Sequence, residues 1–303
     1  MKKTYEHIVA ILIFVSCLGA SKAIFFQDGS SVAKYLEKSA QLEMVQEEHV
    51  QSAMESYLFG EGDSSLSIEA IPNAEERQES VDGFFVADKL MAFMLILLSA
   101  LMLFPKPRES SLKFGLLFIA VWFLSQSIAL MLTGGKKFSE LAILAHAARW
   151  GLPLILLCLL VNKQNLSEWA GRIFISFTFA VHGWEALSLN PPFQDLLFNF
   201  AGHFGYRISS DSISGVLHTV GVMDIGLAVA VLIVKSPRVF LWMACWGFIT
   251  AFSRPLTLGV DAWSEFAIRV ANGGIPLWLL LNKPFKEKTR VEKQQKMEIA
   301  CEI

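Results

Sequence analysis

The sequence predicts an all-α membrane protein, a polytopic bundle of seven to eight transmembrane helices. Hydrophobic residues make up 53% of the chain and charged residues 18%, and the mean hydropathy is +0.46. This composition is typical of integral membrane proteins. Eight apolar stretches approach the ~20 residues that a helix needs to cross a bilayer. They cover about residues 6–25, 85–104, 114–133, 138–161, 173–189, 215–234, 239–258 and 263–281.

The first stretch has two interpretations. Two lysines, an apolar run and Ser21-Lys22-Ala23 resemble a secretory signal with a small-residue cleavage site. Residues 1–26 are therefore either a cleavable signal peptide, which leaves seven spans, or a signal anchor, which leaves eight.

Charge orients the predicted bundle. Segment 27–83 carries 13 Asp and Glu against three Lys and Arg, whereas the tail 284–303 is basic near its start. Lys and Arg concentrate on the cytoplasmic side of membranes, and other basic residues flank three predicted turns. We therefore expect a multi-pass protein of a cell membrane, such as an inner membrane, with segment 27–83 outside and the C-terminus in the cytoplasm. The basic residues of the turns are Lys106, Arg108, Lys113, Lys163, Arg172, Lys235 and Arg238.

A weak internal repeat divides the rest of the chain into first-half helices, 84–162, and a second four-helix unit, 163–283. Arg149 precedes Asn162-Lys163 by thirteen residues, as Arg269 precedes Asn282-Lys283. Further matches in the same order are Lys106-Pro107-Arg108 with Ser236-Pro237-Arg238, and Ala120-Val121-Trp122 with Ala244-Cys245-Trp246. Two parallel copies of a four-helix unit would be related by an axis along the membrane normal, and such a repeat favours a retained first helix.

Ionisable side chains inside the apolar stretches are the clearest functional signal. A charge in hydrocarbon costs several kcal/mol unless it is paired or hydrated, so such residues usually line a path or a site. With a rise of about 1.5 Å per residue, most of them fall in the middle and outer half of the bilayer. We therefore expect a polar pocket that opens outward. Its candidates are His146, Arg149, His182, Glu185, His218, Asp224, Arg254, Glu265 and Arg269, with Asp261 nearby.

Helical spacing groups some of these candidates. His182 and Glu185 share a helix face, as do His146 with Arg149 and Glu265 with Arg269, because side chains three or four apart are neighbours. His218 and Asp224 lie on different faces. These groups could be interhelical contacts that fix packing, a pocket for a small ligand or quinone, metal or haem ligands, or a path for protons or ions. No cofactor is certain and no metal site is expected. Quinone is one candidate ligand. Haem is disfavoured, because no predicted helix carries two histidines.

The second unit resembles the DoxX family of small four-helix membrane proteins over about 170–285. The resemblance rests on a helix opened by an Arg with a following His-Gly, and on a second helix with an acid and Gly that ends at an Arg. The matching residues are Arg172, His182-Gly183, Leu187, Asp224, Gly226 and Arg238. The resemblance implies association with quinone-linked or thiol-linked redox systems at the membrane.

Three functions remain open. The favoured one is a redox-linked membrane subunit with a quinone- or thiol-associated pocket and a membrane redox partner. The alternatives are a small-solute or proton-coupled transporter, and an accessory or assembly protein that binds a protein partner through segment 27–83. The sequence does not establish whether the chain is an enzyme. We expect contact with the lipid bilayer and no nucleic acid partner.

Overall fold

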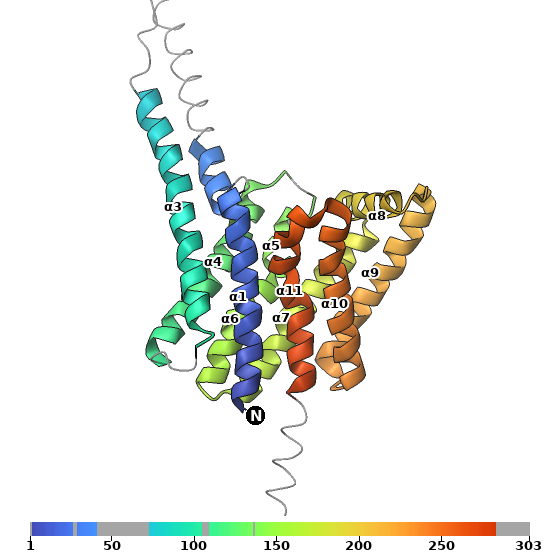
Figure 1. The fold of residues 1–303 in the computed structure, drawn as a ribbon. Coiled ribbons are helices and arrows are strands. Elements are labelled where there is room, and N and C mark those ends of the chain that lie inside the picture. The colour runs from blue at the N-terminus through green and yellow to red at the C-terminus, as the bar shows by residue number, and fades with distance from the viewer. Residues whose placement is uncertain (1, 27–28, 41–72, 105–108, 136, 283–303) are drawn as a thin grey trace, which may run out of the picture.

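The computed structural model describes residues 2–26, 29–40, 73–104, 109–135 and 137–282, and this part of the chain is helical without strands. The predicted all-α class is confirmed. The helices form one bundle, with both the N-terminus of α1 and the end of α11 at its lower end (Figure 1). They are α1 (Lys2–Phe26), α3 (Asn73–Leu101), α4 (Glu109–Thr133), α5 (Ala142–Ala145), α6 (Ala147–Leu160), α7 (Gln164–Leu187), α8 (Pro191–His203), α9 (Ser210–Ile233), α10 (Pro237–Leu258) and α11 (Trp263–Leu281).

Within the described residues, six helical segments are long and apolar enough to cross a membrane. The prediction of seven to eight spans also included α7 and α11. These two helices carry polar side chains such as His182, Glu185, Glu265 and Arg269, which lower their hydropathy. The six segments are Glu6–Ala40, Gly83–Leu101, Leu112–Thr133, Ser139–Leu160, Ser210–Ile233 and Pro237–Leu258.

Large apolar side chains cover the outside of the bundle. Exposed apolar surface on this scale marks contact with a partner or a membrane, and with six candidate spans it identifies an integral membrane protein in contact with lipid. Examples on α3, α4, α9 and α10 are Phe93, Leu97, Phe114, Val121, Val222, Val229, Ile249 and Phe252.

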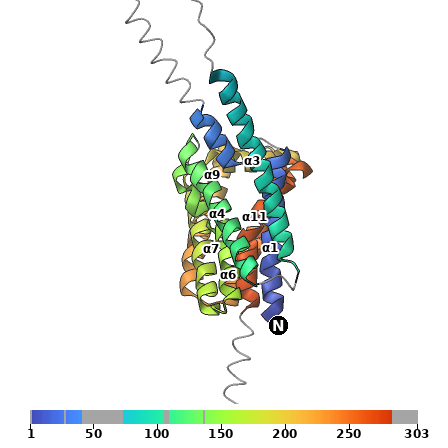
Figure 2. The same cartoon turned by 90° about the vertical axis from the view of Figure 1, so that its left-hand side faces the viewer.

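The helices pair in a regular order. α1 packs against α3 as α7 packs against α9, and α4 packs against α6 as α10 packs against α11. The most extensive contacts between these pairs are those of α1 with α11 and of α6 with α7. α3 extends beyond the bundle at the end where α8 lies, as both side views show (Figures 1 and 2).

Small residues allow the closest helix contacts. A Cβ on Gly183 of α7 would lie 2.9 Å from the carbonyl oxygen of Gly221 of α9, and a Cβ on Gly19 of α1 would lie 2.7 Å from the Cβ of Ala267 of α11. Close approach through glycine is common between membrane helices, because without a side chain the backbones can pack directly. These contacts hold α9 against α7, and α1 against α11 one turn from Glu265.

One predicted span contains a break, and one prediction about a helix boundary is wrong. The stretch 138–161 is confirmed as a candidate span (Ser139–Leu160), although it consists of a 3₁₀ turn (Ser139–Leu141), α5 and α6, with a break at His146. Arg172 does not open its helix or flank a turn, since α7 begins two turns earlier, at Gln164, and Arg172 is buried.

The remaining domain predictions fall partly outside the described residues. These include most of the acidic segment 27–83, with its proposed partner surface, and the tail 284–303. The turn residues Lys163, Lys235 and Arg238 lie at the end of the bundle that holds the N-terminus of α1 (Figure 1).

Candidate functional site

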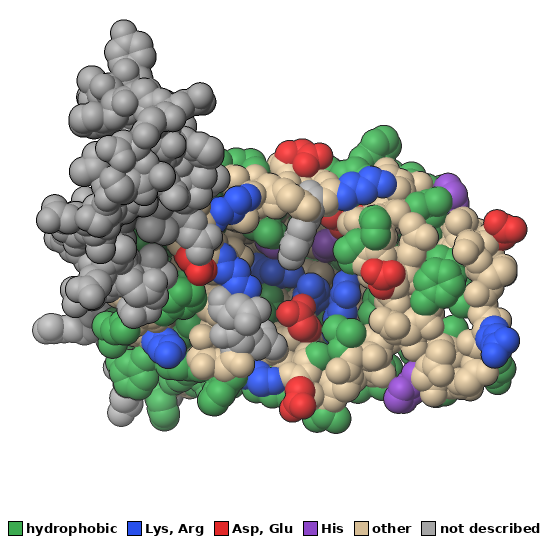
Figure 3. Space-filling view, turned by 90° about the horizontal axis from the view of Figure 1, so that it is seen from above, with side chains coloured by type: hydrophobic (Ala, Val, Ile, Leu, Met, Phe, Trp, Pro, Cys, Tyr) green, Lys and Arg blue, Asp and Glu red, His purple; other side chains and the backbone are tan. Residues whose placement is uncertain are grey.

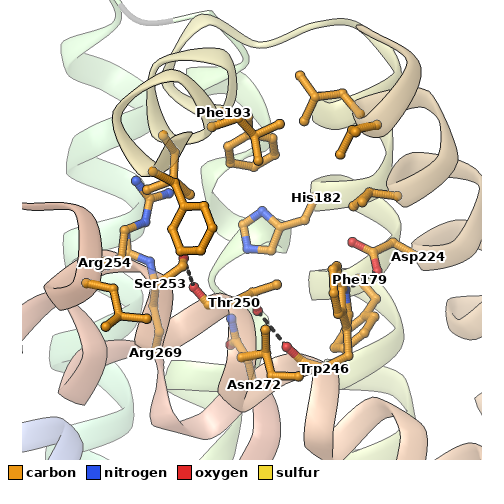
Figure 4. A pocket seen from close by; sticks show the side chains of 18 residues that line it. Phe179, His182, Phe193, Asp224, Trp246, Thr250, Ser253, Arg254, Arg269 and Asn272 are labelled. Atoms are coloured by element: carbon orange, nitrogen blue, oxygen red, sulfur yellow. Dashed lines mark hydrogen bonds between the residues drawn. The ribbon is translucent and has the colours of Figure 1, made fainter. Parts of the chain in front are cut away.

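A cavity of about 340 Å³ lies between α7, α8, α9, α10 and α11. Most of its wall is apolar and includes Phe179, Phe193, Leu197, Phe200, Leu217 and Ile249. Polar side chains enter it from four of the helices, and Figure 4 shows them around the central ring of His182. They are His182, Asp224, Trp246, Thr250, Ser253, Arg254, Arg269 and Asn272.

Local sequence places the helices that form this cavity. Pro191 begins α8, where a missing N–H costs nothing. Ser209 caps α9 by accepting a hydrogen bond from the Ser212 backbone N–H, and Ser236 caps α10 in the same way, from the Arg238 N–H. α8 connects α7 to α9 across the end of the bundle, and Phe193 of α8 faces the cavity beneath it (Figure 4).

His182 projects into the cavity from α7. Its Nδ1–H donates to the Glu185 carboxylate over 3.0 Å, as their spacing predicted, since a carboxylate only accepts. The ring also meets Phe193 edge-on, with centroids 6.1 Å apart. Glu185 therefore fixes the orientation of the imidazole and leaves Nε2 for a ligand in the cavity.

Asp224 forms the opposite wall. Its side chain is 6% exposed and accepts a hydrogen bond of 2.8 Å from the indole Nε1–H of Trp246. This contact joins α9 to α10. A buried carboxylate needs such a donor because unpaired burial is costly.

Two arginines stand on the α10 and α11 side of the cavity, where Figure 4 shows them next to each other. Arg269 pairs with Glu265 one turn earlier, as predicted, and also donates to the Glu265 carbonyl oxygen over 2.9 Å. The side chain of Arg254 makes no hydrogen bond or ion pair within the described residues, yet its charge acts on Glu265 and Arg269. Arg149, on α6, interacts electrostatically with the same two residues.

His146 lies at the break between α5 and α6. Its Nδ1 is 3.2 Å from the hydroxyl oxygen of Ser127 on α4. The His146 ring also interacts electrostatically with Arg149, His182 and Arg269. His146 therefore belongs to the same polar end of the bundle without lining the cavity.

The structure brings together most of the predicted site residues, but not all of them. His182, Asp224, Arg254 and Arg269 line the cavity, whereas His146, Arg149, Glu185 and Glu265 stand behind or beside them. His218 does not belong to this group: its side chain is exposed on α9 and its Nδ1–H donates to the Ser214 carbonyl over 2.7 Å. Asp261 is exposed as well, and its carbonyl accepts from Lys22.

Sequence reasoning missed several lining residues. Asn272 and Thr250 contribute polar groups, and α8 contributes Phe193, Leu196, Leu197 and Phe200. The spacing of Glu265, Arg269 and Asn272 is a helical repeat of one face, and this signal could have identified Asn272.

Comparisons with models of protein families, with curated proteins and with solved structures find no match for this chain. Within the described ranges, no three His, Cys, Asp or Glu side chains come together in a way that could hold a metal ion. The site is therefore interpreted from its own geometry.

Proposed function

We propose that this integral membrane protein is a redox-linked subunit that binds a quinone in the cavity between α7 and α11. The observation that supports the proposal is the cavity itself. Its volume of about 340 Å³ falls in the range of pockets that hold small molecules, which are mostly apolar with a few placed polar groups.

The wall of the cavity suits a flat ring with two carbonyl oxygens. Phe179, Phe193 and Trp246 offer aromatic faces, Arg254 offers N–H donors, and His182 offers its Nε2. Quinone reduction takes up two electrons and two protons, and a His held by a Glu can pass a proton at such a site. The electrons would come from the membrane redox partner.

An apolar tail would reach lipid between α9 and α10. These helices are joined by a short turn at the lower end of the bundle and diverge towards α8 (Figure 1). Val216 and Ile249 line the cavity and are 42% and 59% exposed. This arrangement supports a ligand that enters from the bilayer.

The resemblance of 170–285 to the DoxX family agrees with this proposal. Two of its residues, His182 and Asp224, are cavity residues, and its glycine at position 183 makes the close contact between α7 and α9. At the opposite end of the bundle, Arg172 pairs with Glu168 one turn earlier on α7, and its Nη1 donates to the Val231 carbonyl oxygen on α9 over 3.4 Å.

We further propose eight crossings with a retained α1. Val9, Ile13 and Cys17 of α1 are fully or almost fully buried in the core against other helices. Cleavage after residue 23 would leave the matching face of α11 without its partner. The turns with Lys163 and Lys235 would then be cytoplasmic, and α8 would lie outside.

Transport of a small solute is the second candidate, and the order of helix packing favours it. The pairs α1–α3 and α4–α6 correspond to α7–α9 and α10–α11, and the contact of α1 with α11 corresponds to that of α7 with α6. This correspondence supports two parallel copies around an axis along the membrane normal, which is one arrangement used by transporters. Proton-driven uptake into proteoliposomes tests it.

Mass spectrometry of co-purified lipids tests the quinone proposal. The full chain is purified in a mild detergent, extracted with organic solvent and assayed for quinone per mole of protein. We expect near-stoichiometric quinone in the wild type and a loss of about tenfold in His182→Ala/Glu185→Ala, because the polar contact of His182 with the ring, about 1.5 kcal/mol, is removed together with the carboxylate that orients it.

His218→Ala is the matched control, since this histidine is exposed on the outside of α9. It should keep its quinone. Wild-type protein without quinone, or equal retention in all three proteins, would contradict the proposal.

A further inference from the structure

The three arginines Arg149, Arg254 and Arg269, named here the arginine cluster, carry more charge than their neighbours neutralise. Arg149 and Arg254 both interact electrostatically with Glu265, which is already paired with Arg269. The next carboxylate, Glu185, acts on Arg254 but holds the His182 ring. Within the described residues, neither Arg149 nor Arg254 forms an ion pair of its own.

Such an excess is costly in a membrane protein. Placing one arginine at the centre of a membrane helix costs about 2.5–3.5 kcal/mol on insertion scales, and like charges raise this cost because they repel one another. Arg149 and Arg269 occupy matching positions in the weak internal repeat of the sequence, so both halves of the chain contribute a positive charge to the same place. Packing alone does not require three guanidinium groups around one carboxylate.

The cluster lies towards an accessible end of the bundle. Figure 3 shows this end from above, with Lys and Arg side chains gathered in a hollow at its centre. Arg254 and Arg269 also line the cavity (Figure 4). An anion can therefore reach the guanidinium groups from the end of the bundle or through the cavity.

We propose that the arginine cluster is a binding subsite for an oxyanion, a carboxylate or a phosphate group. The planar guanidinium group presents paired N–H donors that match the two oxygens of such a group. A bound oxyanion would neutralise the positive charge of the arginine cluster that Glu265 does not neutralise. The subsite stands on charge and position alone and does not depend on a quinone in the cavity.

Two sources could supply this group, a soluble anion or the headgroup of an anionic lipid. The first arm of the test titrates inorganic phosphate into the purified full chain and follows its thermal unfolding midpoint, with chloride adjusted to hold the ionic strength constant. The second arm reconstitutes the chain in vesicles of phosphatidylcholine and phosphatidylglycerol and measures retained lipid by native mass spectrometry.

Saturable stabilisation by phosphate would identify a soluble anion, and preferential retention of phosphatidylglycerol would identify a lipid headgroup. Either result supports the subsite if Arg149→Gln weakens it about tenfold or more, because a charge-assisted hydrogen bond contributes about 1.5–3 kcal/mol. Arg207→Gln is the matched control, since Arg207 is exposed in the connection between α8 and α9, and it should bind as the wild type does.

A third variant separates binding from folding. Glu265→Gln removes the competing carboxylate, so it should bind the anion more tightly than the wild type even if it is less stable. Arg149→Lys keeps the charge but loses the paired N–H donors, so its binding should fall between that of the wild type and that of Arg149→Gln. The proposal is overturned if neither phosphate nor phosphatidylglycerol binds the wild type, if Arg207→Gln loses as much as Arg149→Gln, or if Glu265→Gln binds more weakly.

Discussion

Arg172 and Arg149 are both arginines inside the bundle, but their surroundings differ. Arg172 is 1% exposed, its Nη2 lies 3.1 Å from the Glu168 carboxylate, and its guanidinium lies 5.3 Å from the Phe240 ring centre. Arg149 has no such ion pair within the described residues and shares Glu265 with two other arginines. The first arginine is neutralised where the helices pack, and the second leaves positive charge for a ligand.

Arg172→Gln should have the largest effect on stability. Removing one partner of a buried ion pair costs about 3–5 kcal/mol, because the other charge loses its partner. Lys235 lies 3.8 Å from Glu168 and offsets part of this cost, so we expect a loss of about 3 kcal/mol. The unfolding midpoint of the purified protein measures it. A variant as stable as the wild type would show that Arg172, through Glu168, Val231 and Phe240, does not stabilise the packing of α7.

Glu265→Gln should be the next most harmful change. The Arg269 pair is lost and the arginine cluster keeps its full repulsion, so we expect a loss of about 2 kcal/mol. Phosphate should restore most of the lost midpoint. A loss that no anion reverses would argue for a purely structural role of Glu265.

Trp246→Phe tests the polar wall opposite the arginines. The ring remains but the N–H donor to Asp224 is removed, which should cost about 1.5 kcal/mol, since one buried acceptor loses its partner. Chemical denaturation in detergent measures the change. An unchanged free energy of unfolding would mean that water satisfies Asp224 instead.

His218→Ala should have the smallest effect, within about 0.5 kcal/mol, because its ring is exposed and contacts only its own helix. Stability and quinone content should both match the wild type. A marked change in quinone content would show that His218 contributes to the quinone site.

The sequence predicted the helical stretches and the pairs within one helix, because hydrophobic length and spacing are local properties. His182 with Glu185, and Glu265 with Arg269, follow from spacing alone. The direction of His218 could not be predicted, since it depends on how α9 turns against α7, and the Gly183–Gly221 contact fixes that rotation.

Contacts between distant residues were also beyond local reasoning. The hydrogen bond from Trp246 to Asp224 joins two helices, and the position of Phe193 over His182 depends on α8 lying across the bundle. The early start of α7 was missed because Glu168 and Arg172 interrupt the apolar run, although each neutralises the other.

The most direct test of the central claim measures the unfolding midpoint of Arg149→Gln with and without phosphate, beside Arg172→Gln. Without phosphate, we expect Arg149→Gln to be more stable than the wild type by about 1 kcal/mol, because repulsion within the arginine cluster is relieved. Phosphate should then stabilise the variant less than the wild type. The account would be contradicted if Arg149→Gln were destabilised as Arg172→Gln is and gained as much stability from phosphate as the wild type. That result would mean that the arginine cluster carries no excess charge for a ligand to neutralise.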